Sequence, residues 1–197
     1  MKILMTNHRI DRRGGTELFV DEASNQLRKG GHEVCVFSTL QGLSLVERLE
    51  AAGAGVVADP ADCPFTPDII HGQHHLETMA ALCSWPRTPA IYFAHGYAPW
   101  EEQPPVHPRI RKYVTTSPLM AEWLALFSDL PEPERSDAWS RRMSELHRQY
   151  LVGDLYICAS ERQRYWWLGQ LEAAGRLHPA TFSQDRSLHN LVDVVPY

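Results

Sequence analysis

The first forty residues constrain the fold most strongly, because they predict a strand, a glycine turn, a helix and a second strand in that order. Residues 1–6 form an apolar run, and Gly14 and Gly15 follow a polar loop. Residues 16–29 repeat apolar side chains at every fourth position, which is typical of an amphipathic helix. The next apolar run, residues 33–38, predicts the second strand. A glycine turn at a helix N-terminus leaves backbone N–H groups free, so we expect a ligand-binding edge at the carboxyl end of a sheet.

The alternation of strands and helices continues along the chain. Further strands are predicted over residues 55–58, 68–71, 90–94, 112–116, 155–158 and 193–196. Helices are predicted over residues 43–52, 76–83 and 138–151, after Ser117, and between Ser160 and Gly175, with an acidic, proline-rich loop over residues 129–137. This order implies a mostly parallel sheet covered on both faces. We therefore predict an α/β, Rossmann-like three-layer fold that spans residues 1–197 as a single domain.

Bulk properties narrow the class of protein. The net charge of −5 argues against general affinity for nucleic acid. No apolar run approaches the roughly 20 residues needed to span a bilayer, and no secretory signal precedes the first strand. The four cysteines are widely spaced, which favours reduced thiols in a cytoplasmic protein over disulfides.

Several motifs are shared with one family of enzymes. They occupy residues 2–5 with 14–17, residues 28–34, residues 67–71 with the strand that ends at His95, and residues 154–161 with 194–197. In their order and spacing, the motifs resemble the N-terminal, acceptor-side domain of GT-B fold glycosyltransferases, close to glycosyltransferase family 4.

The resemblance implies one half of a GT-B architecture, in which two Rossmann-like domains face a cleft. The chain would then be the acceptor-side domain of a retaining glycosyltransferase, which moves a sugar from a nucleotide-diphosphate sugar to an acceptor hydroxyl. The donor-binding C-terminal domain is absent from these 197 residues, so we expect activity only with that domain or a partner chain. No cofactor is expected, and peripheral contact with a membrane stays open.

The resemblance also implies roles for particular residues. The turn of Gly14, Gly15 and Thr16 would approach the donor diphosphate or the transferred sugar. His95 follows an apolar strand and is the candidate catalytic residue, through positioning or charge stabilisation rather than as a base. The remaining candidates for substrate binding are polar or aromatic residues after strands, namely His71, His74, Gly96, Trp100, Glu101, Ser160 and Arg162.

Each candidate also has a plainer interpretation. Capping of a helix is enough to explain Ser160, and a place on the solvated surface is enough to explain Arg162. A zinc site at His71 and His75 is disfavoured, because residues 67–71 predict a strand and so the two histidines would not share a helical face. No metal is therefore expected.

Two other functions remain open at this stage. The first is a non-catalytic sugar-binding or partner module of the same fold. The second, a dinucleotide-binding protein, is less favoured because the glycine turn lacks the Gly-x-Gly-x-x-Gly pattern. The second strand also ends in Phe37 and Ser38 rather than in an acidic residue that would bind a ribose.

Overall fold

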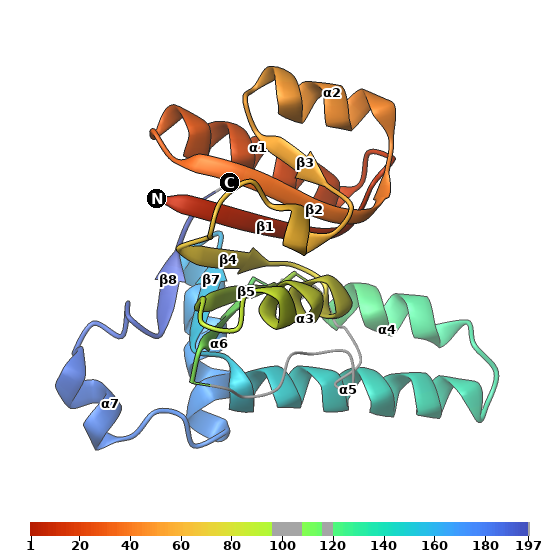
Figure 1. Cartoon of the computed structure of the whole chain (residues 1–197). Coiled ribbons are helices and arrows are strands. Elements are labelled where there is room, and N and C mark those ends of the chain that lie inside the picture. The colour runs from red at the N-terminus through yellow and green to blue at the C-terminus, as the bar shows by residue number, and fades with distance from the viewer. Residues whose placement is uncertain (96–107, 116–119, 197) are drawn as a thin grey trace. The chain divides into compact units, whose positions relative to one another are not determined.

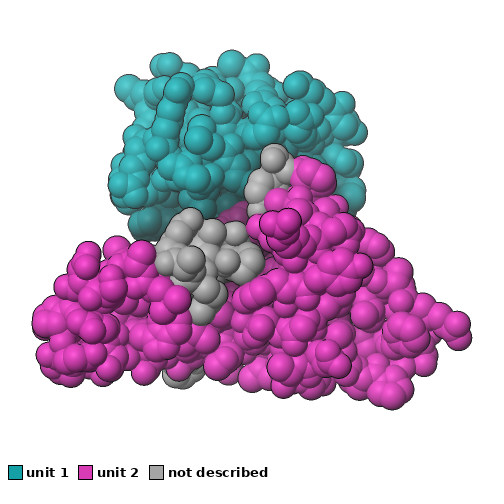
Figure 2. All heavy atoms as spheres, turned by 180° about the vertical axis from the view of Figure 1, so that it is seen from behind, with its two compact units in different colours: residues 1–93, 102–111 teal, residues 94–101, 112–197 magenta. Residues whose placement is uncertain are grey.

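The structure, a computed structural model of the whole chain, describes residues 1–95, 108–115 and 120–196 (Figure 1). The chain divides into two compact units (Figure 2). Unit 1 comprises Met1–Phe93 and Glu102–Arg111, and unit 2 comprises Ala94–Glu101 and Lys112–Tyr197.

Unit 1 is a parallel sheet with helices on both faces. Its strands are β1 (Lys2–Ile10), β2 (Glu33–Gln41), β3 (Gly55–Val57), β4 (Ile69–Gly72) and β5 (Ala90–Ala94), the last residue of which belongs to unit 2. Its helices are α1 (Gly15–Lys29), α2 (Leu43–Ala51), α3 (His75–Ser84) and the 3-10 helix η1 (Pro60–Asp62). The strand order is β3-β2-β1-β4-β5, and every pairing is parallel. The chain moves outward from β1 in one direction and from β4 in the other, so a topological switch point lies between these two strands.

Side chains of β1 alternate between the two faces of this sheet. Ile3 and Met5 belong to an apolar core with residues of β2, α1 and α2, and Ser24 of α1 donates a hydrogen bond to the sulfur of Met5 (3.3 Å). Thr6 lies on the opposite face, where its hydroxyl oxygen is 3.2 Å from that of Thr78 in α3. The helices α1 and α2 therefore cover one face and α3 the other (Figure 1).

Thr6 also ties β1 to the chain that leaves β4. Its hydroxyl donates to the carbonyl of Gln73 (2.9 Å) and accepts from the N–H of the same residue (3.0 Å). Gly72 has room for no side chain, because a Cβ atom there would lie 2.6 Å from two side-chain atoms of Thr78. These contacts set where the loop between β4 and α3 begins.

Helix α1 buries acidic residues as well as apolar ones. Ala23 and Leu27 pack against the core, as their spacing predicts. Glu17 and Asp21 are also buried, each about 4% exposed. Arg12 and Arg48 form ion pairs with these two carboxylates, which offsets the cost of burying them.

Unit 2 has the same kind of architecture. Its strands β6 (Ile110–Val114, of which the first two residues belong to unit 1), β7 (Leu155–Cys158) and β8 (Val192–Val194) pair in parallel in that order. Its helices are α4 (Met120–Ser128), α5 (Glu134–Val152), α6 (Glu161–Ala173) and α7 (Pro179–Gln184). The core contains the fully buried Trp167, whose ring centroid lies 4.8 Å from that of Tyr156.

The predicted fold class is confirmed, since the protein is α/β with parallel strands and a Rossmann-like three-layer arrangement. Several boundaries differ from the prediction, and the second strand, predicted to end at Ser38, continues to Gln41. The first strand continues to Ile10, because residues 7, 9 and 10 pair with β2 although their side chains are mostly polar. Helix α5 begins at Glu134 rather than at residue 138, and the carboxylate of Glu132 accepts hydrogen bonds from the N–H and hydroxyl of Ser136 in its first turn. Helix α7 was not predicted, and Ser117 lies outside the described residues.

No helix in the described ranges combines the length and the apolar character needed to cross a bilayer.

The Thr6 tie predicts a measurable loss of stability. In Thr6→Val the buried N–H of Gln73 loses its partner and the carbonyl keeps only the longer bond from Thr78 (3.4 Å), so we expect the free energy of unfolding to fall by about 1–3 kcal/mol. Urea unfolding would measure it. Thr66 is exposed, with no hydrogen bond from its side chain among the described residues, so Thr66→Val is the matched control and should change stability by less than about 0.5 kcal/mol. Equal effects of the two substitutions would contradict the role given to Thr6.

Candidate functional site

The candidate site lies in unit 1, where β1 and β4 end at the switch point. In folds of this kind, ligands bind in the crevice beyond the carboxyl ends of the strands that flank such a point. The loop from β1 to α1 and the loop from β4 to α3 both begin there.

Two buried carboxamides lie at the strand ends. Met5 pairs with His71 in the sheet, and continuing that register by two residues places Asn7 beside Gln73. Both side chains are completely buried. The nitrogen and the oxygen of each carboxamide have no hydrogen-bond partner among the residues that the structure describes. Buried polar atoms in folded proteins are almost always satisfied, so these four atoms are exceptions to that rule at the carboxyl edge of the sheet.

The double-glycine turn begins α1 beyond the end of β1, as predicted, but its two glycines differ in their surroundings. A Cβ atom at Gly14 would lie 2.5 Å from Oε2 of Glu17, whereas Gly15 has open space around it. The Glu17 carboxylate accepts a hydrogen bond from the hydroxyl of Thr16 (3.1 Å) and lies 3.7 Å from the guanidinium of Arg12. The protein's own carboxylate therefore lies against the helix N-terminus, where it would repel a phosphate and accept hydrogen bonds from hydroxyl groups.

His74 joins the two loops of the site. Its Nε2 lies 3.4 Å from the hydroxyl oxygen of Thr16, which brings together two residues that the sequence analysis had selected. Its φ of 60° is uncommon for a residue with a side chain, and such conformations occur often at functional sites. Burial lowers the pKa of His74, so its ring is neutral at pH 7 and can both donate and accept a hydrogen bond.

A carboxylate and an imidazole form a pair at the same edge. Glu77 in the first turn of α3 is 3% exposed, and one of its carboxylate oxygens lies 2.9 Å from Nδ1 of His8. The hydroxyl of Thr39 donates to the same oxygen (3.1 Å). A carboxylate at Nδ1 favours the tautomer in which Nε2 accepts a proton or a hydrogen bond. The ring centroids of His8 and His74 are 6.0 Å apart, so both imidazoles lie together at this edge.

His71 lies in the wall of this region. Its ring stacks on Phe93 with centroids 4.4 Å apart and an interplanar angle of 15°, and Phe19 of α1 lies 5.8 Å from it. Burial lowers the pKa of His71 to about 4. His71 is therefore a neutral, packed side chain. Among the described residues, no three His, Cys, Asp or Glu side chains come together in an arrangement that could hold a metal ion.

The other predicted site residues lie in unit 2 or outside the described residues. His95 belongs to unit 2, where its Nδ1 lies 3.0 Å from the hydroxyl oxygen of Thr115. Ser160 caps α6 by accepting a hydrogen bond from the N–H of Gln163 (3.3 Å), and Arg162 is exposed in the first turn of that helix. The roles predicted for these residues remain predictions. Gly96, Trp100 and Glu101 lie outside the described residues.

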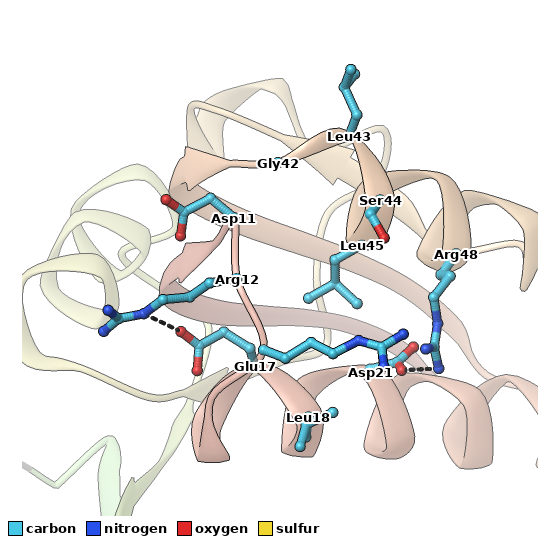
Figure 3. Close-up of a pocket in the computed structure, with 11 residues that line it drawn as sticks. Asp11, Arg12, Glu17, Leu18, Asp21, Gly42, Leu43, Ser44, Leu45 and Arg48 are labelled. Atoms are coloured by element: carbon cyan, nitrogen blue, oxygen red, sulfur yellow. Dashed lines mark hydrogen bonds and ion pairs between the residues drawn. The ribbon is translucent and has the colours of Figure 1, made fainter.

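A pocket of about 300 Å³ opens beside the glycine turn, between the start of α1, the loop after β1 and the start of α2 (Figure 3). Its lining contains arginines, carboxylates and leucines, namely Asp11, Arg12, Arg13, Glu17, Leu18, Asp21, Gly42, Leu43, Ser44, Leu45 and Arg48. Glu17 belongs both to this lining and to the turn, so the pocket adjoins the switch point.

No family model matches the chain, and no curated protein matches it in sequence. The ligand must therefore be inferred from the chemistry of these residues.

Four polar residues of this edge were not predicted from the sequence, namely Asn7, His8, Gln73 and Glu77. Asn7 and His8 lie in the polar half of β1, which was predicted to be a loop. A signal was nevertheless present, because polar side chains directly after an apolar strand often line a site at the carboxyl edge.

The low pKa of His71 predicts that stability depends on pH. The unfolded chain binds a proton at His71 near pH 6.5 and the folded protein only near pH 4, so stability is complete above pH 6.5 and declines as the pH falls between these values. From pH 7 to pH 5 we expect His71 to account for a loss of about 1–2 kcal/mol.

Urea unfolding of His71→Phe at pH 7 and pH 5 tests this, because the substitution keeps a ring to stack on Phe93 and removes the titrating group. The decline should become smaller in this variant. The control His147→Gln replaces an exposed histidine and should leave the decline unchanged. An undiminished decline in His71→Phe would show that His71 is not its source.

Proposed function

We propose that the chain is the acceptor-side domain of a retaining glycosyltransferase, which transfers a sugar from a nucleotide-diphosphate sugar to an acceptor hydroxyl together with a donor-binding domain. The observation that carries this proposal is the group of polar side chains at the carboxyl ends of β1 and β4. The family resemblance of the sequence motifs supports it, and so does the Rossmann-like fold.

The chemistry of the site favours a ligand rich in hydroxyl groups. A hydroxyl both donates and accepts a hydrogen bond. The neutral ring of His74 offers both kinds of partner. The carboxylate of Glu17 accepts only, which disfavours a phosphate at the start of α1. The same carboxylate argues against a dinucleotide, since the Rossmann fold holds a pyrophosphate at this position.

In the proposed reaction the acceptor oxygen forms a bond to the anomeric carbon, and the bond between that carbon and the donor phosphate breaks. In the retaining scheme that the family resemblance implies, the leaving phosphate takes the proton of the acceptor hydroxyl. His8, held by Glu77, and His74 would orient that hydroxyl through hydrogen bonds. A cytoplasmic location fits the four cysteines, none of which forms a disulfide.

Binding of neutral sugars tests the proposal. We expect titration of the ¹⁵N-labelled chain with monosaccharides and methyl glycosides to shift the amide resonances of Thr16, Gln73 and His74. His74→Gly keeps a residue that tolerates positive φ and removes the ring, so affinity should fall about tenfold with the loss of one or two hydrogen bonds. Leu188 is the other non-glycine residue with φ of 60° among the described residues, and Leu188→Gly is the matched control, which should bind as the unaltered chain does.

Three outcomes separate the possible functions. Sugar binding that His74→Gly weakens, without sugar transfer by the chain alone, supports the proposal. Transfer by the chain alone would contradict the need for a second domain. Tight binding of NAD, with no binding of any neutral sugar, would overturn the proposal in favour of a dinucleotide-binding protein.

A further inference from the structure

The pocket beside the glycine turn contains one arginine, Arg13, that forms no ion pair with the residues that the structure describes. Each of the three carboxylates in the lining has an arginine partner. Arg9, outside the lining, donates two hydrogen bonds of 2.7 Å to Asp11. Arg12 lies 3.7 Å from Glu17, and Arg48 is in contact with Asp21 (Figure 3). The bonds from Arg9 lower the pKa of Asp11, so this carboxylate stays ionised and neutralised. Arg13 makes no hydrogen bond or ion pair with any residue that the structure describes.

The start of α2 supplies unpaired donors to the same pocket. Gly42 precedes the helix and provides no side-chain cap. The N–H groups of Leu45 and Val46 bond to the carbonyl of Gly42, whereas those of Leu43 and Ser44 have no acceptor among the described residues. A Cβ atom at Gly42 would lie 2.6 Å from Cα of Asp11, so the absence of a side chain lets the two loops close the pocket. The free N–H groups and Arg13 therefore contribute uncompensated positive charge.

The rest of the lining is suited to hydroxyl groups and a small apolar surface. Asp21 points from α1 toward Arg48 of α2, Glu17 points toward Arg12 of the loop after β1, and Leu45 points from α2 toward α1 (Figure 3). Their carboxylate oxygens can accept hydrogen bonds from hydroxyls while the arginines hold them in place. A volume of about 300 Å³ lies at the small end of the range for ligand pockets, which limits the ligand to about one sugar ring with a charged substituent.

We infer that this pocket binds the phosphorylated part of a small polyol such as a sugar phosphate. The phosphate contacts Arg13 and the N–H groups of Leu43 and Ser44, and the hydroxyls contact Asp21 and Glu17. The role of this ligand as the acceptor rests on the proposed function, whereas its binding follows from the pocket alone.

The experiment compares glucose 6-phosphate, inorganic phosphate and glucose by calorimetry and by NMR titration of the ¹⁵N-labelled chain. We expect glucose 6-phosphate to bind more tightly than either other probe and to shift the amide resonances of Leu43 and Ser44. Arg13→Gln should weaken its binding about tenfold or more, because a charge-assisted contact is lost. Arg87→Gln replaces another exposed arginine of unit 1 and should bind as the unaltered chain does.

A second variant tests the helix donor without changing charge. Leu43→Pro removes one N–H group at the first position of α2, where proline is favoured, and the extended conformation of Gly42 is compatible with a following proline. We expect binding of glucose 6-phosphate to weaken several-fold. Leu43→Ala keeps the N–H group and removes the same exposed side chain, so its affinity should be unchanged.

Absence of binding by glucose 6-phosphate, or equal affinity in Arg13→Gln and the unaltered chain, would overturn the inference. Equal affinity for inorganic phosphate and glucose 6-phosphate would overturn the assignment of the polyol. These results test the pocket separately from the proposed function. In Arg13→Gln, neutral sugars should still bind at the switch point, and His74→Gly should still weaken that binding. Conversely, if the unaltered chain bound no neutral sugar, the proposed function would fail, but binding of glucose 6-phosphate to the pocket would still be expected.

Discussion

The hydroxyl of Thr6 holds together the two strands from which the whole carboxyl edge of unit 1 is built. It accepts a hydrogen bond from the N–H of Gln73 and donates one to the carbonyl of the same residue. Because β1 and β4 lie on either side of the switch point, this contact fixes the distance between the two loops that form the site. The contact of His74 with Thr16, and that of His8 with Glu77, both depend on that distance. A side chain in the sheet therefore positions a site made mainly of loop residues.

At the carboxyl edge of unit 1, charged side chains surround two buried acidic residues of α1. Glu17 lies over the glycine turn, and Asp21 follows one turn later on the same face of α1. Arg12 and Arg48 hold the two carboxylates from neighbouring elements, so the ion pairs offset the cost of burying the acids and join α1 to the loop after β1 and to α2. In the adjoining pocket, by contrast, Arg13 has no ion-pair partner among the residues that the structure describes. One helix N-terminus is covered by a carboxylate and the other is open, although both begin after a glycine.

The fold could be predicted well from local patterns, and the site only in part. The spacing of Ala23 and Leu27 marks the buried face of α1, and the capping of α6 by Ser160 follows from its sequence. The end of β1 was wrong because strand pairing with β2, rather than the polarity of the residues, decides where the strand stops. Asn7 and His8 were missed for the same reason. The sequence predicted that Thr16 and His74 lie at the same edge of the sheet, but not that their side chains are in contact.

The sequence by itself determined the α/β class, the parallel character of the sheet and the glycine turn at the start of α1, because apolar periodicity and helix-end signals act over a few neighbouring residues. Only the tertiary structure decided which polar side chains are buried, which carboxylate lies against Gly14 and which arginine pairs with each buried acid of α1. Those properties depend on contacts between residues far apart in the chain, such as Arg48 with Asp21 and His8 with Glu77. Local sequence patterns carry no record of such contacts.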